Sequence, residues 1–404
     1  MNIVALGMDN RFGWLVFDVI AFCRSLNGQW PLLVVVAFWS GVLLYHTFRR
    51  KDWLLVVLLF AVVLTSLRDA LGSGQITDAT LFLLGVSFGR GICLLVFNQN
   101  NPANDHDNVR AVSWVMACLV WLLAASTLWE FTTFNHFSFA VRWSGFWQNP
   151  NIFGMLIGTG LVLGMALLLT SCEGPDGKVR PRVGYLTFLV FALCLLATAL
   201  VFSFSRGAWF STLCGMLYLC RSAGRSSWRF VLLILLCGLA VAGSFWRSTG
   251  DDDPLYLKRL DFSRPSVGHR VAAWQGAVFM MRDHPLGVGW GKAIDVYEKS
   301  YSAPGKGSRA IETNSYLMFG AEAGVLSVLS LAIYVLLCLR SAGDVPAGSM
   351  ACRAGAMVLL ISFWFDGGLF RLPTASIFWL LLELGAGRKR TTRQTEWPLE
   401  HRCL

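Results

Sequence analysis

An arginine, Arg206, interrupts an apolar stretch that reads LVFSFSRGAWFSTL from residue 200 to residue 213. Ser205 precedes it, where a serine can cap a new helix, and Gly207 follows it. A helix start presents backbone N–H groups without intrahelical partners, and an arginine can donate two parallel hydrogen bonds to one oxyanion. The stretch therefore predicts a phosphate-binding corner between two helices, with Arg206 as its cation.

Three other arginines lie beside apolar segments. Arg142 occurs in FAVRWSGFWQNPN, Arg270 in HRVAAWQGAVFMMRDHPLG and Arg371 in GGLFRLP. Arginines at the edge of a membrane commonly only extend to lipid headgroups or bond nearby carbonyls. That structural interpretation is favoured for Arg142 and Arg371, whereas the serines and glycine around Arg206 favour anion binding there.

A second helix start is predicted at Gln148-Asn149-Pro150-Asn151. Asn149 can cap a helix, and Pro150 suits its first position. Two GxxxG pairs follow, at 154–158 and 160–164, and such small residues allow close packing of helices in a membrane. A plain helix cap and a ligand contact explain Asn149 and Asn151 equally well.

These segments belong to a strongly apolar chain. Its 404 residues are 55% hydrophobic and 14% charged, with a mean hydropathy of +0.56, whereas soluble domains are about 25% charged. We therefore expect an all-α polytopic membrane protein with about 12 transmembrane helices, since each crossing needs about 20 apolar residues. The predicted spans are 12–28, 31–47, 53–67, 80–97, 111–129, 151–171, 183–203, 207–220, 230–246, 315–339, 354–365 and 374–386.

The basic residues indicate the orientation of these spans. Lysines and arginines gather in alternate loops and in the tail GRKRTTR, which places both termini in the cytoplasm. This pattern explains most of the net charge of +10 without nucleic acid as a partner. The predicted divisions are helices in 1–246, a loop outside the cytoplasm in 247–313, further helices in 314–387 and a basic cytoplasmic tail in 388–404.

The large loop offers no cofactor motif. One part of it, HRVAAWQGAVFMMRDHPLG, reads as a helix that ends before Pro285, with Arg270 and Trp274 on one face. The run Gly287-Val-Gly-Trp-Gly-Lys292 lacks the spacing of a nucleotide-binding loop and predicts a turn. The 11 cysteines include no CxxC pair, so neither a metal site nor a disulfide framework is indicated.

Four motifs resemble the O-antigen ligase and O-antigen polymerase superfamily of bacterial envelopes. They are FWQNPNIFG at 146–154, FSFSRGAW at 202–209, HRVAAWQGAVFMMRDHPLGVGWG at 269–291 and NSYLMFGAEAGVLS at 314–327. The resemblance implies a multi-pass glycosyltransferase of the bacterial inner membrane whose large loop, with short helices, is periplasmic. Such enzymes move a glycan from an undecaprenyl-diphosphate carrier to an acceptor, in O-antigen or exopolysaccharide biosynthesis, without a metal or other cofactor. The acceptor is a lipid A–core sugar in ligases and a sugar of the growing polymer in polymerases.

The resemblance also assigns roles to residues of this chain. By the motif match, Arg206 and Arg270 would hold the carrier diphosphate and act in catalysis. The further candidates for contact with substrate are Arg142, Asn149, Asn151, Ser205, His284, Asn314 and Arg371.

The chain departs from the ligase pattern just before Asn314. Ligases carry a histidine in the place of Thr313, and threonine cannot act as a base. Glu312 is adjacent and could be the base if burial raised its pKa, although a dipole partner for the helix start is the favoured interpretation. His284 is another candidate, and His269 beside Arg270 is more typical of a solvated residue. The missing histidine favours a polymerase or a divergent exopolysaccharide transferase over a ligase.

Two other classes of protein compete with this interpretation. A transporter or flippase of lipid-linked glycans would carry charges or broken helices near the middle of the membrane. The charges to examine for that class are Asp18, Arg24, Arg90, Glu322 and Glu383. A relative without activity that only scaffolds an assembly complex would also tolerate the lost histidine.

Overall fold

The computed structural model describes the chain in eleven stretches: 38, 40–45, 47–48, 52–70, 77–96, 105–132, 142–172, 183–223, 265–302, 313–340 and 347–386. Every regular element in these stretches is a helix, and none of them contains a strand, which confirms the all-α class. The predicted spans 12–28 and 230–246 and the basic tail 388–404 lie outside the described residues, as do Asp18 and Arg24.

Three helices of the described part are long and apolar enough to cross a membrane. They are α5 (Asp105–Thr132), α6 (Pro150–Cys172) and α7 (Val183–Phe202). Shorter apolar helices accompany them within α3 (Trp53–Ala70), α14 (Val325–Arg340), α15 (Ala347–Ser362) and α16 (Leu372–Ala386). The chain is therefore a membrane protein by its apolar helices, and the total of about 12 crossings remains a prediction.

The central helix of the bundle is α6, whose membrane-length window is entirely buried. Its two GxxxG pairs let neighbouring helices approach closely, as predicted. A side chain at Gly154 or Gly158 would meet α8 (Arg206–Ala223), while one at Gly160 or Gly164 would meet α5 or α7. The small residues of α6 therefore bring α8, and with it Arg206, against the start of α6.

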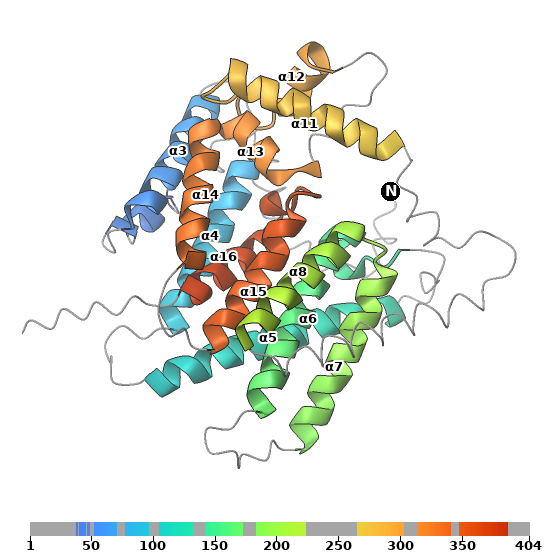
Figure 1. The fold of residues 1–404 in the computed structure, drawn as a ribbon. Coiled ribbons are helices and arrows are strands. Elements are labelled where there is room, and N and C mark those ends of the chain that lie inside the picture. Colours follow the sequence, from blue (N-terminus) through green and yellow to red (C-terminus); the bar gives the residue numbers. More distant parts are fainter. Residues whose placement is uncertain are drawn as a thin grey trace, which may run out of the picture.

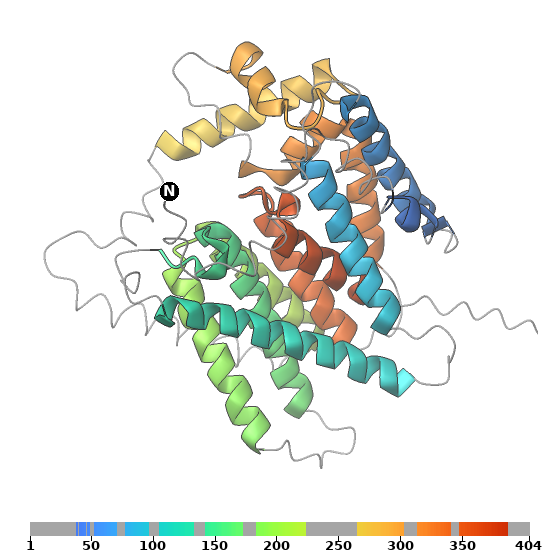
Figure 2. The ribbon, with the colours of Figure 1, turned by 180° about the vertical axis from the view of Figure 1, so that it is seen from behind.

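The second half of the bundle forms around α16. This helix packs along α15 and α4 (Thr77–Val96), while α15 also packs on α6 and α8 (Figures 1 and 2). Gly85 and Gly89 of α4 face the backbone of α16 so closely that any Cβ there would clash. Through α15, the first and second halves of the chain share one apolar core.

The predicted span 315–339 is wrong as a single helix. It divides into α13 (Ser315–Ala323) and α14 at Gly324, whose φ is +88°. A Cβ at Gly324 would lie 2.7 Å from the carbonyl oxygen of Pro285, so only glycine allows the preceding loop to approach there. The break lies inside the predicted span, at the end of α13, and the loop from residue 284 to residue 292 packs against it.

The predicted span 354–365 is displaced from the helix observed there. Helix α15 begins earlier, at Ala347, because Arg353 is accommodated inside the bundle. The Arg353 guanidinium donates to the carbonyl oxygens of Gly385 and Leu339, at 2.7 and 3.3 Å. A charge satisfied in this way does not end a helix, although it ends an apolar run in the sequence.

A buried ion cluster joins α4, α14 and α16 to Asp52, the residue before α3. Arg90 on α4 is 3% exposed and bonds Asp52, Glu383 and Tyr334. The Tyr334 hydroxyl donates to the same Glu383 oxygen at 2.5 Å. Breaking a buried pair of this kind leaves an uncompensated charge, so these contacts fix α4, α14 and α16 relative to one another.

Two helices lie across one end of the bundle. They are α11 (Pro265–Asp283) and α12 (Ala293–Ser300), which rest on α13 (Figure 1). The predicted loop helix is thereby confirmed, with its end before Pro285. The small packed core beneath it contains Ala273, Ala277 and Met280 of α11 with Tyr297 of α12.

Candidate active site

The corner between α7 and α8 forms as the sequence predicts. Helix α7 ends at Phe202, and α8 begins at Arg206 after a tight turn in which Phe204 has a φ of +47°. The Ser205 carbonyl accepts the Trp209 N–H at 3.0 Å, so Ser205 stands at the cap position of α8. A positive φ is rare for a residue as large as phenylalanine, and strained residues of this kind cluster at functional sites.

The start of α6 meets this corner through two asparagines. Asn149 caps α6, since its side-chain oxygen accepts the N–H groups of Asn151 and Ile152, at 2.9 and 3.3 Å. Asn151 uses its side chain differently. Its oxygen accepts from Arg142 at 2.7 Å, and its amide nitrogen donates to Asp366 Oδ2 at 2.8 Å. Arg142 in turn donates to the Ser203 carbonyl at 2.9 Å, which ties the chain of bonds to the α7–α8 corner.

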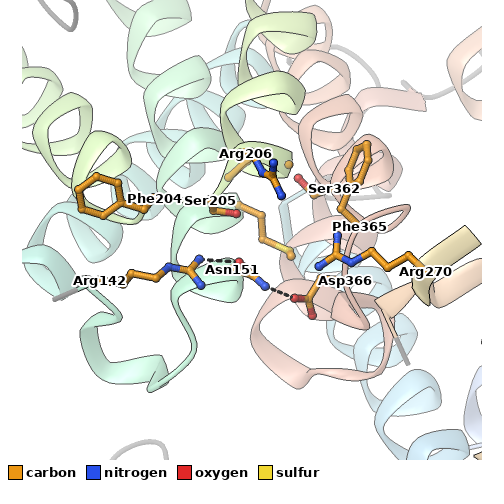
Figure 3. Close-up of a pocket in the computed structure, with 12 residues that line it drawn as sticks. Arg142, Asn151, Phe204, Ser205, Arg206, Arg270, Ser362, Phe365 and Asp366 are labelled. Atoms are coloured by element: carbon orange, nitrogen blue, oxygen red, sulfur yellow. Dashed lines mark hydrogen bonds between the residues drawn. The ribbon is translucent and has the colours of Figure 1, made fainter. Parts of the chain in front are cut away.

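A pocket opens where α6, α8, α11 and the end of α15 meet (Figure 3). Its empty volume, including the mouth, is about 510 Å³. Figure 3 shows that Arg206 and Arg270 enter it from α8 and α11, with Asp366 below Arg270. The lining residues are Arg142, Asn151, Met155, Phe204, Ser205, Arg206, Gly207, Ala208, Arg270, Ser362, Phe365 and Asp366.

The acid of the pocket, Asp366, was not among the residues predicted from the sequence. It lies in the corner between α15 and the short helix η4 (Gly368–Phe370). The Asp366 carbonyl accepts from the Ser315 hydroxyl at 2.7 Å, so the start of α13 fixes this corner. A carboxylate in the apolar stretch SFWFDGG, at the same end of the bundle as Arg206, was the signal that could have identified it.

Burial and neighbouring charges shift the pKa values of two pocket groups in opposite directions. Burial lowers the pKa of Arg270, and the charge of Arg206 lowers it further, while Asp366 opposes both effects. Arginine stays charged under such a shift, because its ordinary pKa is about 12.5 or more. Burial raises the pKa of Asp366, and the Asn151 amide, the Gly367 N–H, Arg371 and Arg270 counteract that rise. The site therefore pairs clustered cations with a carboxyl that accepts a proton more readily than an ordinary aspartate.

The remaining predicted residues that the structure describes do not line the pocket. Asn314 is fully buried and caps α13, since its side-chain oxygen accepts the N–H groups of Tyr316 and Leu317. His284 is exposed at the end of α11, and Arg371 is exposed before α16 but close enough to affect Asp366 electrostatically. Glu312 lies outside the described residues, as does the side chain of His269.

Sequence reasoning thus assigned five residues that the structure brings together: Arg142, Asn151, Ser205, Arg206 and Arg270. Arg142, for which an ordinary interfacial role was favoured, belongs to the same pocket. No group of three or more His, Cys, Asp or Glu side chains suited to a metal ion occurs in the described stretches. The polar chemistry of the pocket is that of guanidinium, amide, hydroxyl and carboxyl groups.

Comparison with known proteins identifies one family. Residues 191–332 match the family described as O-Antigen ligase, and this stretch contains Arg206, Arg270 and Asn314. The match supports the O-antigen ligase and polymerase superfamily indicated by the sequence motifs. No curated protein and no solved structure matches the chain.

Proposed function

From its relation to the O-antigen ligase and polymerase superfamily, we propose that the protein transfers a glycan from undecaprenyl diphosphate to an acceptor sugar at the Arg206–Arg270 pocket. One observation carries the proposal. Two arginines and one carboxyl group, from three separate segments of the chain, converge on a single pocket at one end of the bundle. That set suits a reaction in which a diphosphate leaves and a hydroxyl loses its proton.

The arginines would stabilise the departing diphosphate. The acceptor hydroxyl attacks the anomeric carbon, the bond from that carbon to the diphosphate oxygen breaks, and negative charge grows on the oxygen that leaves. Arg206 and Arg270 come from different helices, so they can approach a diphosphate from two sides. Cations that are fixed before the reaction stabilise the transition state without reorganisation, and this contribution is commonly the largest in an enzyme.

Asp366 is the candidate for the general base. It would accept the proton of the attacking hydroxyl, and its raised pKa brings it nearer to the working pH of the enzyme. The Asn151 amide donates to Asp366 Oδ2 at 2.8 Å, and the Gly367 N–H also bonds this side chain. Both contacts hold the carboxyl group in the pocket wall, where the acceptor hydroxyl would approach it. Because Thr313 stands where ligases carry a histidine, a base supplied by the α15–η4 corner would complete the site.

Arg142 and Asn151 would orient this base. The bonds from Arg142 to Asn151 and from Asn151 to Asp366 form one chain across the pocket wall (Figure 3). A carboxylate that accepts an amide hydrogen bond is held in one rotamer, which a near-attack geometry requires. Asn149 and Asn314 would contribute as the caps that fix the starts of α6 and α13.

The proposed setting is the bacterial inner membrane with the pocket at the periplasmic face. The basic residues of alternate loops support this orientation. Arg206, Asn151 and Asp366 lie at or beside ends of α8, α6 and α15 and line one pocket, so the site lies at one end of these helices. The acceptor would be a sugar of the growing polymer, with the lipid A–core sugar of a ligase as the alternative.

A transporter of lipid-linked glycans is supported less well. The buried charges expected to line its path have structural partners in the described residues. Arg90 and Glu383 form an ion pair, and Glu322 accepts the Gly291 N–H from the loop after α11. The pocket with Arg206 and Arg270 lies at one end of the bundle, which favours chemistry at one face.

The test is a transfer assay with the purified full-length protein and an undecaprenyl-diphosphate glycan. The glycan is offered either lipid A–core or a second lipid-linked glycan as acceptor, and the products are identified by mass. Transfer to the second glycan supports a polymerase, and transfer to lipid A–core supports a ligase. Movement of the intact lipid-linked glycan across vesicles, without any new glycosidic bond, would contradict the proposal.

A further inference from the structure

The loop that follows α11 is held at its far end by two buried acids. Asp69, near the end of α3, is 3% exposed, and Glu322, at the end of α13, is fully buried. Asp69 accepts the Trp290 N–H at 2.7 Å, and Glu322 accepts the Gly291 N–H at 3.0 Å. These two contacts tie consecutive backbone N–H groups of the loop to side chains held inside the bundle, so they fix the position of the loop.

Further bonds reinforce the same attachment. The Trp290 indole donates to Thr65 at 3.0 Å, and Arg68 donates to the carbonyls of Leu286 and Gly287. Val288 and Gly289 donate to the carbonyls of the last residues of α13, at 2.8 and 3.2 Å. The indole ring of Trp290 is fully buried against Phe319 and Phe370.

Three glycines make this attachment possible. Gly287, Gly289 and Gly291 have φ values of +80°, +109° and +68°. A Cβ at Gly289 would lie 2.7 Å from Asp69 Oδ1, and one at Gly287 would clash with the Glu322 carbonyl. The sequence predicts a turn here, and the turn presents the consecutive N–H groups of Trp290 and Gly291 to the two acidic side chains.

The attachment sets the direction of α11, because the loop continues that helix. Arg270 lies 13 residues before the end of α11 at Asp283, a distance of about 20 Å along the helix axis. At that length, a rotation of about 3° at the attachment moves the Arg270 backbone by about 1 Å. A displacement of about 1 Å at a catalytic group can cost about 10²-fold in rate.

We propose that Asp69 and Glu322 are positioning residues for glycan transfer, which hold the 284–292 loop so that Arg270 faces Arg206 and Asp366 across the pocket. The inference deepens the proposed function and rests on it for the role of Arg270. The two acids act through α11 and do not touch substrate. Residues far apart in the sequence, on α3 and α13, therefore determine the geometry of a site built by α6, α8, α11 and the α15–η4 corner.

The test compares two substitutions at each acid in the full-length protein. Asp69→Ala and Glu322→Ala remove the acceptors, whereas Asp69→Asn and Glu322→Gln keep an oxygen for the Trp290 and Gly291 N–H groups. Asp283→Ala is the matched control, because Asp283 lies beside the same loop but bonds only Arg282 and Tyr301 at the surface. Hydrogen exchange of the amides in 265–292 is measured without substrate, and transfer rates are measured alongside it.

The alanine variants should speed exchange in the loop and in α11, and they should lower kcat by about 10²-fold with a much smaller change in donor KM. Asn and Gln should restore slow exchange and most of the rate, and the control should behave as the native protein. Unchanged exchange in both alanine variants would overturn the inference. It would equally be overturned if the Asn and Gln variants lost the rate while their exchange stayed slow. Since exchange needs no substrate, a native protein that transfers no glycan would contradict only the proposed function.

Discussion

The Asn151 amide nitrogen donates to Asp366 Oδ2 at 2.8 Å, and this bond joins the start of α6 to the corner after α15. The two residues are 215 positions apart in the chain. Asn151 was predicted at a helix start, where a plain cap and a ligand contact were equally favoured, and Asp366 was not predicted at all. Together they define the wall of the pocket that faces Arg206 and Arg270 (Figure 3).

The bond leads to a prediction about pH. A base must be unprotonated, so the transfer rate should fall as the pH drops through the pKa of Asp366, which lies above the ordinary value of about 3.9. Asn151→Ala and Arg371→Ala each remove a group that favours the carboxylate, so the pKa should rise further. The acid limb of kcat/KM should therefore move to higher pH in both variants.

The control for this measurement is Asp295→Asn, an exposed acid on α12 outside the pocket, which should leave the limb in place. A limb that moves to lower pH in Asn151→Ala, or that does not move in either variant, would show that Asp366 does not set the acid side of the profile.

Replacing the carboxyl group of Asp366 should slow glycan transfer and preserve the fold. Asp366→Asn keeps an oxygen and the size of the side chain but removes the basic site, so kcat should fall about 10²–10⁴-fold. Glu312→Gln, at the base suggested by the sequence, should stay close to the native rate. Single-turnover transfer rates of both variants, measured at equal protein concentration, test this prediction. A larger loss of rate in Glu312→Gln than in Asp366→Asn would contradict it.

Close packing of α6 against α8 predicts a stability effect. A Cβ at Gly158 would clash with the Thr212 hydroxyl, so Gly158→Ala should destabilise the protein by about 1–3 kcal/mol through overpacking. Gly91 on α4 has open space around its Cβ position, so Gly91→Ala should be neutral or stabilising. Thermal unfolding in detergent checks the pair, and equal midpoints for both variants would refute the packing argument.

The buried ion cluster predicts that the stability losses from substitutions at Arg90 and Glu383 are not additive. Arg90→Met leaves Glu383 buried without its cation and should cost about 3–5 kcal/mol. Adding Glu383→Gln removes the stranded charge and should recover part of that loss. Denaturant unfolding of both single variants and the double variant measures the coupling free energy between the two residues. If the double variant loses as much free energy of unfolding as the two single variants together, the assigned ion pair is contradicted.

Hydropathy and helix-cap chemistry predicted most of the local structure. The helix starts at Pro150 and Arg206, the helix around Arg270 and the glycine turn before Lys292 all follow from rules about neighbouring residues. Arg206 was identified because its charge interrupts an apolar stretch beside serines and a glycine, and Arg270 was joined to it by the motif match to the superfamily. These features need no knowledge of which helices pack together.

Partners across the fold could not be predicted in that way. The break at Gly324 depends on the carbonyl of Pro285. Arg353 can lie inside a helix of the bundle because it donates to carbonyls of two other helices. Asp366 belongs to the site only because α13 and α15 bring its corner to the start of α6. Periodicity along a chain carries no information about such contacts between distant segments.

The central claim is that Arg206 and Arg270 together stabilise the departing diphosphate. The most direct measurement is the rate of glycan transfer by the purified native protein, Arg206→Ala and Arg270→Ala, at equal expression and membrane insertion. We predict that each substitution lowers kcat/KM by at least about 10²-fold, as removal of one transition-state donor does in other enzymes. A native rate of transfer in either variant would contradict the account.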